Sequence, residues 1–457
     1  MNSPAQKVGE LLSLLYSVLK WFLLALIAGV LVGATAALFL NLLHDGELIV
    51  AGFAPWLRYV LLPLGLLAST LLVVRLAPEA KGHGTEKVIE AIHRKAGRMT
   101  IAVIPVKLVA TIITLSVGGS AGKEGPCAQI GAGITSTLAT WFRFNDEDRK
   151  KLVICGISAG FAAIFGTPVA GAVFGIEVLF IGQMFYDVML PSFVSGIVAY
   201  HTALLLGITY PSQTLYVVPA LSGSALLWVL AAGVFFGIVS LVHIESLGVV
   251  ERFFHRLRIP YWQKPLLGGF LLLGATFLFG PLYLGLGMET VNAALAGSPV
   301  PPVAFLLKSL FTGVTLGCGG SGGIVTPTLF VGATAGSLFA LITGLDGTFC
   351  AALGLTSVLA GAANTPVAAT IMAMELFGAQ LAPLGALSAI IAFVISGHRS
   401  VYPSQVLARP KSRILLVEKA VPVDESLLKR HTSDLLPVRL WLRGKRLWVG
   451  RKGRRLQ

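Results

Sequence analysis

The chain has 457 residues, of which 55% are hydrophobic and 12% are charged, and its formal net charge is +14. A soluble domain carries about 25% charged residues, so this composition and a mean hydropathy of +0.82 exclude an ordinary soluble protein. They predict an all-α polytopic membrane protein, because helices satisfy their own backbone polar groups in lipid. We expect the transmembrane domain to occupy residues 21–408.

The apolar runs predict the membrane spans, which follow an N-terminal segment, residues 1–20, expected in the cytoplasm. In chain order, the candidate spans are 21–43, 56–76, 100–117, 191–206, 226–242, 264–279, 302–317 and 383–395. Several of these runs are shorter than the ~20 residues that cross a bilayer core upright. We therefore expect short, broken or strongly tilted helices.

Most of the positive charge lies at the C-terminal end, where residues 409–457 hold 14 Lys or Arg against 4 Asp or Glu. The positive-inside rule places this basic tail in the cytoplasm, where it could also bind anionic lipid. Trp441 and Trp448 alternate with arginines there, which is typical of a segment on a membrane surface. Lipids are therefore expected partners, and nucleic acid is not.

The cysteines are scattered through apolar sequence and form no CxxC pair. They are expected to be small buried hydrophobic residues rather than disulfides or metal ligands: Cys127, Cys155, Cys318 and Cys350. We predict no metal and no other cofactor.

The sequence contains an internal repeat. The glycine-rich segment 118–126 recurs 201 residues later at 319–327, and the segment 156–177 recurs 198 residues later at 354–375. Because order and spacing are kept, we predict two related halves, about 21–206 and 222–408, as in transporters built by duplication. The halves could be inverted or parallel. Lys107 and Lys308 also match, and we expect them at helix ends, reaching carbonyls or lipid headgroups.

Both copies of the glycine-rich segment interrupt long apolar stretches. Broken backbone at membrane depth is tolerated only where it is buried in protein or lines a cavity. Pro126 suits the first turn of a helix, and a helix N-terminus facing the interior offers free N–H groups and about half a positive charge. The two breaks therefore predict an anion site. Glu124, a carboxylate at this depth, is functional by default and could compete with the anion.

At this point a family resemblance becomes specific. The Gly-Lys-Glu-Gly-Pro segment at 122–126, the Gly-Gly-Ile-Val-Thr-Pro segment at 322–327 and the Gly-His-Gly segment at 82–84 resemble the signature regions of the CLC family of chloride channels and chloride/proton antiporters. Tyr402 matches the family's pore tyrosine. The resemblance covers roughly residues 20–410 and implies a CLC-like fold with inverted-repeat halves and a homodimer with one pore in each subunit.

The resemblance also implies residue roles. Glu124 corresponds to the gating glutamate, which occupies an external anion site and swings away. Ile324 and Val325 are expected to offer backbone amides to a central anion, and Tyr402 its hydroxyl. The complete set of expected anion-binding residues is His83, Gly84, Lys123, Gly125, Ile324, Val325 and Tyr402.

His83 departs from the family pattern. Chloride-selective members of the family have serine there, nitrate-preferring members proline and fluoride exporters methionine. Histidine can donate a hydrogen bond to an anion, or it can point away and leave only backbone amides. Thr85 and Glu86 replace the usual Ile-Pro, and Glu86 and Lys87 are expected to be ordinary polar residues of an interfacial helix.

A second departure concerns protons. Proton-coupled members carry a glutamate one position after the place of Glu177, and here that position is Val178. Channel-type members have valine there, so the resemblance favours passive conduction. Glu177 could substitute as a proton carrier, but its match to Glu375 favours a structural role. Glu124, Glu177 and the Val178 position are the candidates for a proton pathway.

We therefore expect a gated chloride channel in the plasma (inner) membrane, with a chloride/proton antiporter as the alternative and a carrier of fluoride or nitrate as a third reading. The chain lacks the motifs of an intramembrane enzyme, and a cation carrier would use intramembrane aspartates rather than amides. Small inorganic anions, and protons in the antiporter reading, are the expected ligands. The roughly 50 residues after Arg409 are too few for the nucleotide-binding regulatory domain of larger relatives, so no ATP or AMP site is predicted.

Overall fold

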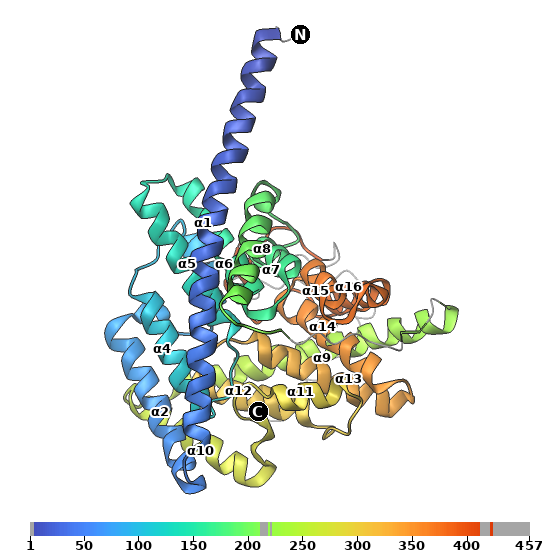
Figure 1. Cartoon of the computed structure of the whole chain (residues 1–457). Coiled ribbons are helices and arrows are strands. Elements are labelled where there is room, and N and C mark those ends of the chain that lie inside the picture. Colours follow the sequence, from blue (N-terminus) through green and yellow to red (C-terminus); the bar gives the residue numbers. More distant parts are fainter. Residues whose placement is uncertain (1–3, 211–217, 220–221, 412–420, 424–457) are drawn as a thin grey trace, which may run out of the picture.

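The computed structural model describes residues 4–210, 218–219, 222–411 and 421–423, and these residues are mostly helical (Figure 1). The first half holds α1 (Pro4–Ala51), α2 (Pro55–Leu76), η1 (Pro78–Ala80), α3 (Thr85–Arg94), α4 (Val103–Ser116), α5 (Glu124–Trp141), α6 (Asp146–Phe165), α7 (Pro168–Glu177), β1 (Phe180–Ile181), η2 (Tyr186–Val188) and α8 (Met189–Leu205). The second half holds α9 (Gly223–Arg256), α10 (Gln263–Phe279), η3 (Pro281–Tyr283), α11 (Met288–Leu295), α12 (Ala304–Gly317), α13 (Val325–Thr343), α14 (Gly347–Ala363), α15 (Pro366–Phe377), η4 (Ala379–Leu381), α16 (Ala382–Ile395) and β2 (Val406–Leu407).

The predicted apolar runs coincide with helices. Five helices of the described chain are long and apolar enough to cross a membrane, and further apolar helices, such as α4 and α12, are only 10–17 residues long. The expectation of many short, broken helices is therefore confirmed. The first and fifth runs were underestimated, because α1 and α9 continue well beyond the apolar cores at 21–43 and 226–242.

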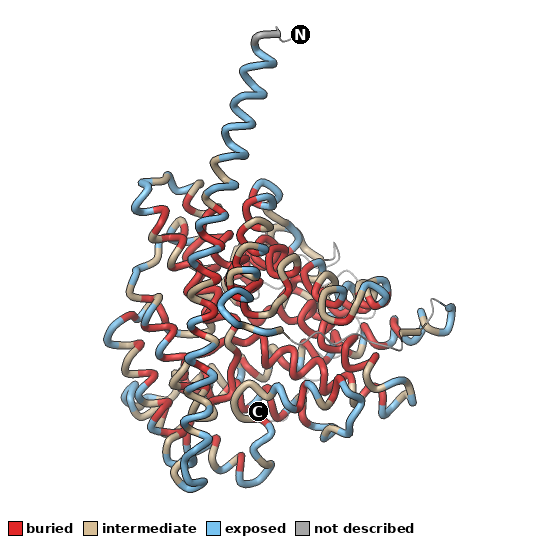
Figure 2. The backbone as a smooth tube through the Cα atoms, in the orientation of Figure 1, coloured by how far each residue is buried: buried red, intermediate tan, exposed pale blue. Residues whose placement is uncertain are grey.

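Helix α1 contains most of the segment that was expected to stand apart as residues 1–20. Its N-terminal part projects from the rest of the molecule (Figure 1) and is exposed along its length (Figure 2). Apolar side chains such as Leu12 and Tyr16 are among the exposed ones. Of the predicted basic tail at 409–457, residues 412–420 and 424–457, including both tryptophans, lie outside the described residues.

Close glycine contacts pack the same helix pair in each half. Gly131 of α5 faces Gly156 of α6, and a Cβ atom on either residue would collide with the carbonyl oxygen of the other. In the second half, Gly332 of α13 and Gly354 of α14 stand in the same mutual relation. Small residues let helix backbones approach closely in membrane proteins. The repeated glycines therefore encode one packing arrangement twice, and these helices form the buried centre of the molecule (Figure 2).

The two halves are related by a local twofold arrangement at α7 and α15. Glu177, at the end of α7, accepts hydrogen bonds from the N–H groups of Val367 (3.1 Å) and Ala368 (2.8 Å) at the start of α15. Glu375 of α15 accepts the corresponding bonds from Val169 (3.0 Å) and Ala170 (2.8 Å) at the start of α7. Such reciprocal contacts between equivalent residues are the mark of a twofold relation.

Candidate anion site

The glycine-rich breaks of the two halves meet directly. The Gly122 N–H donates to the Gly323 carbonyl at 2.7 Å, and the Gly323 N–H donates to the Gly122 carbonyl at 2.6 Å. Helix α5 begins immediately after the first break, with Lys123 at its N-cap, and α13 begins after the second, with Ile324 at its N-cap. Two positive helix ends are thereby brought together in the protein interior, as the sequence predicts.

Hydroxyl groups hold each broken segment in place from the opposite half. The Ser120 N–H donates to Thr315 Oγ1 at 3.0 Å, and the Ser321 N–H donates to Thr114 Oγ1 at 3.1 Å. The serine hydroxyls continue the network at 3.0–3.1 Å, Ser321 with Thr111 and Ser120 with Thr312. These partners satisfy backbone donors that an interrupted helix would leave unpaired.

Glu124 is almost completely buried, with 1% of its surface exposed. Its carboxylate crosses to the other half, where it accepts hydrogen bonds from the Thr326 N–H at 3.1 Å and from Thr326 Oγ1 at 2.6 Å. The carboxylate therefore sits at the N-terminus of α13, in the position that an anion would take there.

Sequence reasoning missed Thr326, although a signal was present. In the aligned repeats Thr326 stands where the first copy has Gly125, so a hydroxyl replaces a bare backbone at a matched position. The repeat alone did not reveal that the glutamate of one copy would reach this hydroxyl in the other.

A cavity of about 570 Å³ leads to this pair. Glu124 and Thr326 line it together with Lys123. Its other lining residues include His44 of α1, Tyr210 from the segment after α8 and Asn292 of α11. Lys123 contributes a positive charge beside the carboxylate.

The loop before α3 forms the third part of the site. Gly84 caps α3 with a φ of 77°, and a Cβ atom there would collide with the Gly125 carbonyl. A Cβ atom on Gly125 would in turn meet the His83 carbonyl. The positive φ and the close backbone contact both require glycine at position 84. Consequently the N-terminus of α3 lies against that of α5.

Two buried lysines hold the loops that precede α3 and α11. Lys107 Nζ donates to the carbonyls of Ala80 (3.0 Å) and Gly82 (2.7 Å), whereas Lys308 Nζ donates to those of Tyr283 (3.1 Å) and Gly285 (2.7 Å). Neither lysine has exposed surface. The possibility that they reach lipid headgroups was therefore wrong, since their amino groups are used by equivalent carbonyls inside each half.

Polar groups without a hydrogen-bond partner collect beside these helix ends. Tyr402 is 1% exposed, and its hydroxyl lies next to Thr85 of α3 and within electrostatic range of Glu124. Among the described residues, neither hydroxyl has a partner with hydrogen-bond geometry, and the same holds for His83 Nδ1. Buried hydroxyls of this kind fit an anion, which accepts hydrogen bonds and donates none.

The expected anion-binding set is thus brought together at three adjoining helix N-termini: His83 and Gly84 at α3, Lys123 and Gly125 at α5, and Ile324 and Val325 at α13, with Tyr402 beside α3. The proton-pathway candidates are divided. Glu124 belongs to this site, whereas Glu177 caps α15 and borders a different pocket of about 400 Å³ with Asn364 and Arg409. Val178 is fully buried.

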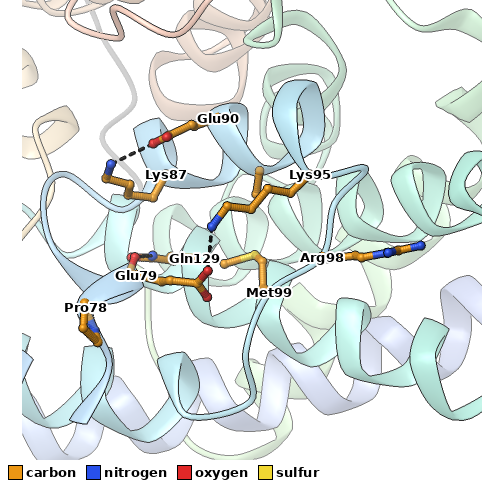
Figure 3. A pocket seen from close by; sticks show the side chains of 9 residues that line it. Pro78, Glu79, Lys87, Glu90, Lys95, Arg98, Met99 and Gln129 are labelled. Atoms are coloured by element: carbon orange, nitrogen blue, oxygen red, sulfur yellow. Dashed lines mark hydrogen bonds and ion pairs between the residues drawn. The ribbon is translucent and has the colours of Figure 1, made fainter. Parts of the chain in front are cut away.

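A further pocket, of about 240 Å³, flanks α3 and is lined by paired charges (Figure 3). Lys95 donates to Glu79 at 2.6 Å, and Lys87 donates to Glu90 at 2.7 Å. Gln129 of α5 donates through Nε2 to the Glu79 carbonyl at 2.9 Å. The two Glu79 contacts join η1 to the end of α3 and to α5, whereas the Lys87–Glu90 pair lies within α3.

Comparison with known proteins agrees with this geometry. The family model described as voltage gated chloride channel matches residues 64–397. A chloride/fluoride channel protein of Pseudomonas syringae pathovar tomato is 35% identical over 417 residues, which are 90% of this chain and 91% of the relative. The voltage-gated ClC-type chloride channel ClcB of Escherichia coli is 31% identical over 380 residues, covering 79% of this chain and 88% of the relative.

Among solved structures, a CLC-type fluoride/proton antiporter superposes with a TM-score of 0.81 at 30% identity, covering 85% of this chain and 98% of that one. The expected CLC-like helical membrane fold is therefore confirmed.

Proposed function

Because this chain belongs to the voltage-gated chloride channel (CLC) family of anion transporters, we propose that it moves small halide ions, fluoride or chloride, across a membrane in exchange for protons. The observation that carries this proposal is the Glu124 carboxylate bound to the first turn of α13. This carboxylate takes the place of an anion and lines a cavity, so an entering anion must displace it and a proton must neutralise it.

The proposed cycle follows from competition for the same donors. Ionised Glu124 occupies the Thr326 N–H and hydroxyl at the α13 N-terminus. A proton arriving through the 570 Å³ cavity neutralises the carboxylate and weakens its hold, since hydrogen bonds to a charged acceptor are the stronger ones. The carboxyl then leaves, and a halide takes its place at the Thr326 N–H.

On the other side of the gate, the anion would meet the donors that lack partners. The Tyr402 and Thr85 hydroxyls lie beside the α3 N-terminus, so a halide there would accept from both. In exchange, a halide that arrives from this side moves to the vacated site and leaves through the cavity. Glu124 gives its proton to the side from which the halide came and returns, ionised, to Thr326. In this scheme one carboxylate serves both ions, and no separate proton carrier at Val178 is required.

The substrate range is proposed from the relatives and from His83. The Pseudomonas syringae relative is named as a chloride/fluoride channel, and the similar solved structure is titled a fluoride/proton antiporter. His83 Nδ1 is buried beside the site, and imidazole can donate to a small, strongly hydrated anion. Fluoride therefore ranks with chloride as a substrate.

Passive conduction is the second candidate, and Val178 in place of the usual carboxylate favours it. Proton movement into proteoliposomes, driven only by an outward fluoride or chloride gradient, separates the two. We expect proton uptake with the wild-type chain and anion flow without proton uptake with Glu124→Gln. Anion flow without proton movement in the wild type would replace the exchanger by a channel.

The assembly and its orientation are also proposals. We expect a homodimer with one pore in each subunit, in the plasma (inner) membrane, with residues 1–20 and the basic tail on the cytoplasmic side. The cavity that leads to Glu124 would then face outwards. Cross-linking in membranes and protease access to the tail test these two statements independently of transport.

A further inference from the structure

Glu86, in the first turn of α3, is bonded to the loop that carries Tyr402. The Ser404 N–H donates to Glu86 Oε1 at 3.0 Å, and the Ser404 hydroxyl donates to the same oxygen. These contacts join positions 318 residues apart in the chain. The sequence predicted an ordinary polar residue of an interfacial helix here and did not predict this long-range contact.

The opposite flank of the Tyr402 loop is held by Gln405. Its amide nitrogen donates to the carbonyls of Val178 at 2.7 Å and Ala363 at 2.8 Å, and its side chain is fully buried. The strand pair β1–β2, in which Phe180 faces Val406, continues this attachment. Gln405 and β2 thus bind the loop to α7 and α14, whereas Glu86 alone among these contacts binds it to α3.

This attachment matters because α3 and Tyr402 supply opposite sides of one site. Thr85, the residue before Glu86, lies next to the Tyr402 hydroxyl. Neither of the two hydroxyl groups has a partner with hydrogen-bond geometry among the described residues. A free carboxylate here would repel an anion. The Glu86 carboxylate instead accepts two hydrogen bonds from Ser404 and lies at the N-terminus of α3. Both contacts compensate its negative charge.

We propose that Glu86 is a positioning residue that, through Ser404, seats the Tyr402 hydroxyl opposite Thr85 for binding of a small halide. The inference rests on the proposed function, because it names a determinant of the same anion site. Glu86 touches no anion itself in this arrangement. Its effect on halide affinity must therefore pass through Tyr402.

A double-mutant cycle in the full-length chain tests this dependence. Fluoride and chloride affinity would be measured by calorimetry in detergent for the wild type, Glu86→Ala, Tyr402→Phe and the double variant. We expect each single variant to lose about tenfold in affinity, as for one hydrogen bond to a charged group. The double variant should lose no more than Tyr402→Phe alone.

Matched variants distinguish an effect on the position of Tyr402 from an effect of the Glu86 charge and from a general loss of folding. Glu86→Gln keeps an acceptor oxygen for Ser404 and should restore most of the affinity, although it lacks the charge. Ser404→Ala removes the hydroxyl donor without changing α3, and should lose affinity in the same direction. Glu90→Ala, one turn further along α3 and paired with Lys87, should bind halide as the wild type does.

Additive losses in the double variant, or an unchanged affinity in both Glu86→Ala and Ser404→Ala, would overturn the inference. A Glu86→Gln variant as weak as Glu86→Ala would also overturn it, since charge rather than seating would then be responsible. A wild-type chain that binds and transports neither halide would overturn the proposed function first. The wild-type measurement therefore distinguishes the two failures.

Discussion

The carboxylate of Glu124 and the hydroxyl of Thr326 lie 2.6 Å apart, although the two residues are separated by 202 positions and belong to different repeats. Each repeat supplies one half of the contact: the first gives the acceptor at the start of α5, and the second gives the donor at the start of α13. The Glu124–Thr326 contact is thus made between the two halves, so it requires both copies of the glycine-rich break.

Removing the Thr326 hydroxyl should favour the anion over the carboxylate. We expect Thr326→Val to raise halide affinity about tenfold or more, because a hydrogen bond to a charged group contributes about 1.5–3 kcal/mol. Calorimetric titration with fluoride and chloride measures the change, and Thr326→Ser, which keeps the hydroxyl, is the control. A loss of affinity in Thr326→Val would mean that the hydroxyl serves the anion directly.

Glu177 and Glu375 each accept hydrogen bonds from the first turn of the other's helix, so Glu375 is a control for the structural role of Glu177. Glu177→Ala and Glu375→Ala should each destabilise the protein by about 1–2 kcal/mol, as expected for a lost N-terminal cap, and by similar amounts. Thermal melting in detergent measures this loss. The ratio of protons to anions transported should be unchanged in both. Loss of proton transport in Glu177→Ala alone would instead identify Glu177 as a proton carrier.

Replacing His83 should change which anion is preferred. Its Nδ1 atom is buried and has no hydrogen-bond partner among the described residues, and its carbonyl lies against Gly125 at the start of α5. We expect His83→Ser to shift selectivity towards chloride relative to fluoride and nitrate. Flux ratios from mixed-anion proteoliposomes give the answer, and identical ratios in the variant would mean that the ring points away from the pathway.

Acidification should release the contact that fixes α3 beside the pocket of Figure 3. Lys95 beside Glu79, assisted by hydrogen bonds from Thr100, holds the pKa of the Glu79 carboxyl below its ordinary value of 4.5. A carboxyl of this kind stabilises the fold fully above its ordinary pKa, and the contribution disappears as pH falls through the lowered value. The effect is small, because a partly exposed ion pair contributes about 1 kcal/mol or less.

Glu79→Gln should therefore lower the melting temperature slightly at pH 7, and the difference from the wild type should shrink as the pH falls below 4.5. Glu90→Gln, whose carboxyl is also paired with a lysine but does not contact η1 or the Thr100 segment, is the comparison. A variant that melts like the wild type at neutral pH would show that this pair does not support α3.

The apolar runs and the broken segments could be predicted from the sequence. Helix α2 matches its predicted span at 56–76 to within one residue, and the starts of α5 and α13 follow from the glycine-rich breaks and the prolines after them. These features depend on local composition. The Gly/Ala-rich buried helices α6 and α14 were not among the candidate spans, although the second repeat runs through both.

The contacts that complete the site could not be derived from local sequence. Thr326 and Glu86 act on residues 202 and 318 positions away, and nothing near either residue indicates its partner. Lys107 was predicted at a helix end, but its enclosure by carbonyls depends on how η1 folds over α4. Internal repeats supply part of what is missing, since matched residues make matched contacts, as Glu177 and Glu375 do.

The measurement that tests proton-coupled halide exchange most directly is the zero-current voltage of the reconstituted chain under a fixed halide gradient, with and without a pH gradient. Exchange through Glu124 predicts that the voltage moves away from the halide equilibrium potential when a pH gradient is imposed, with fluoride and chloride alike. A voltage that follows the halide equilibrium potential and ignores pH would contradict exchange and identify a passive anion channel.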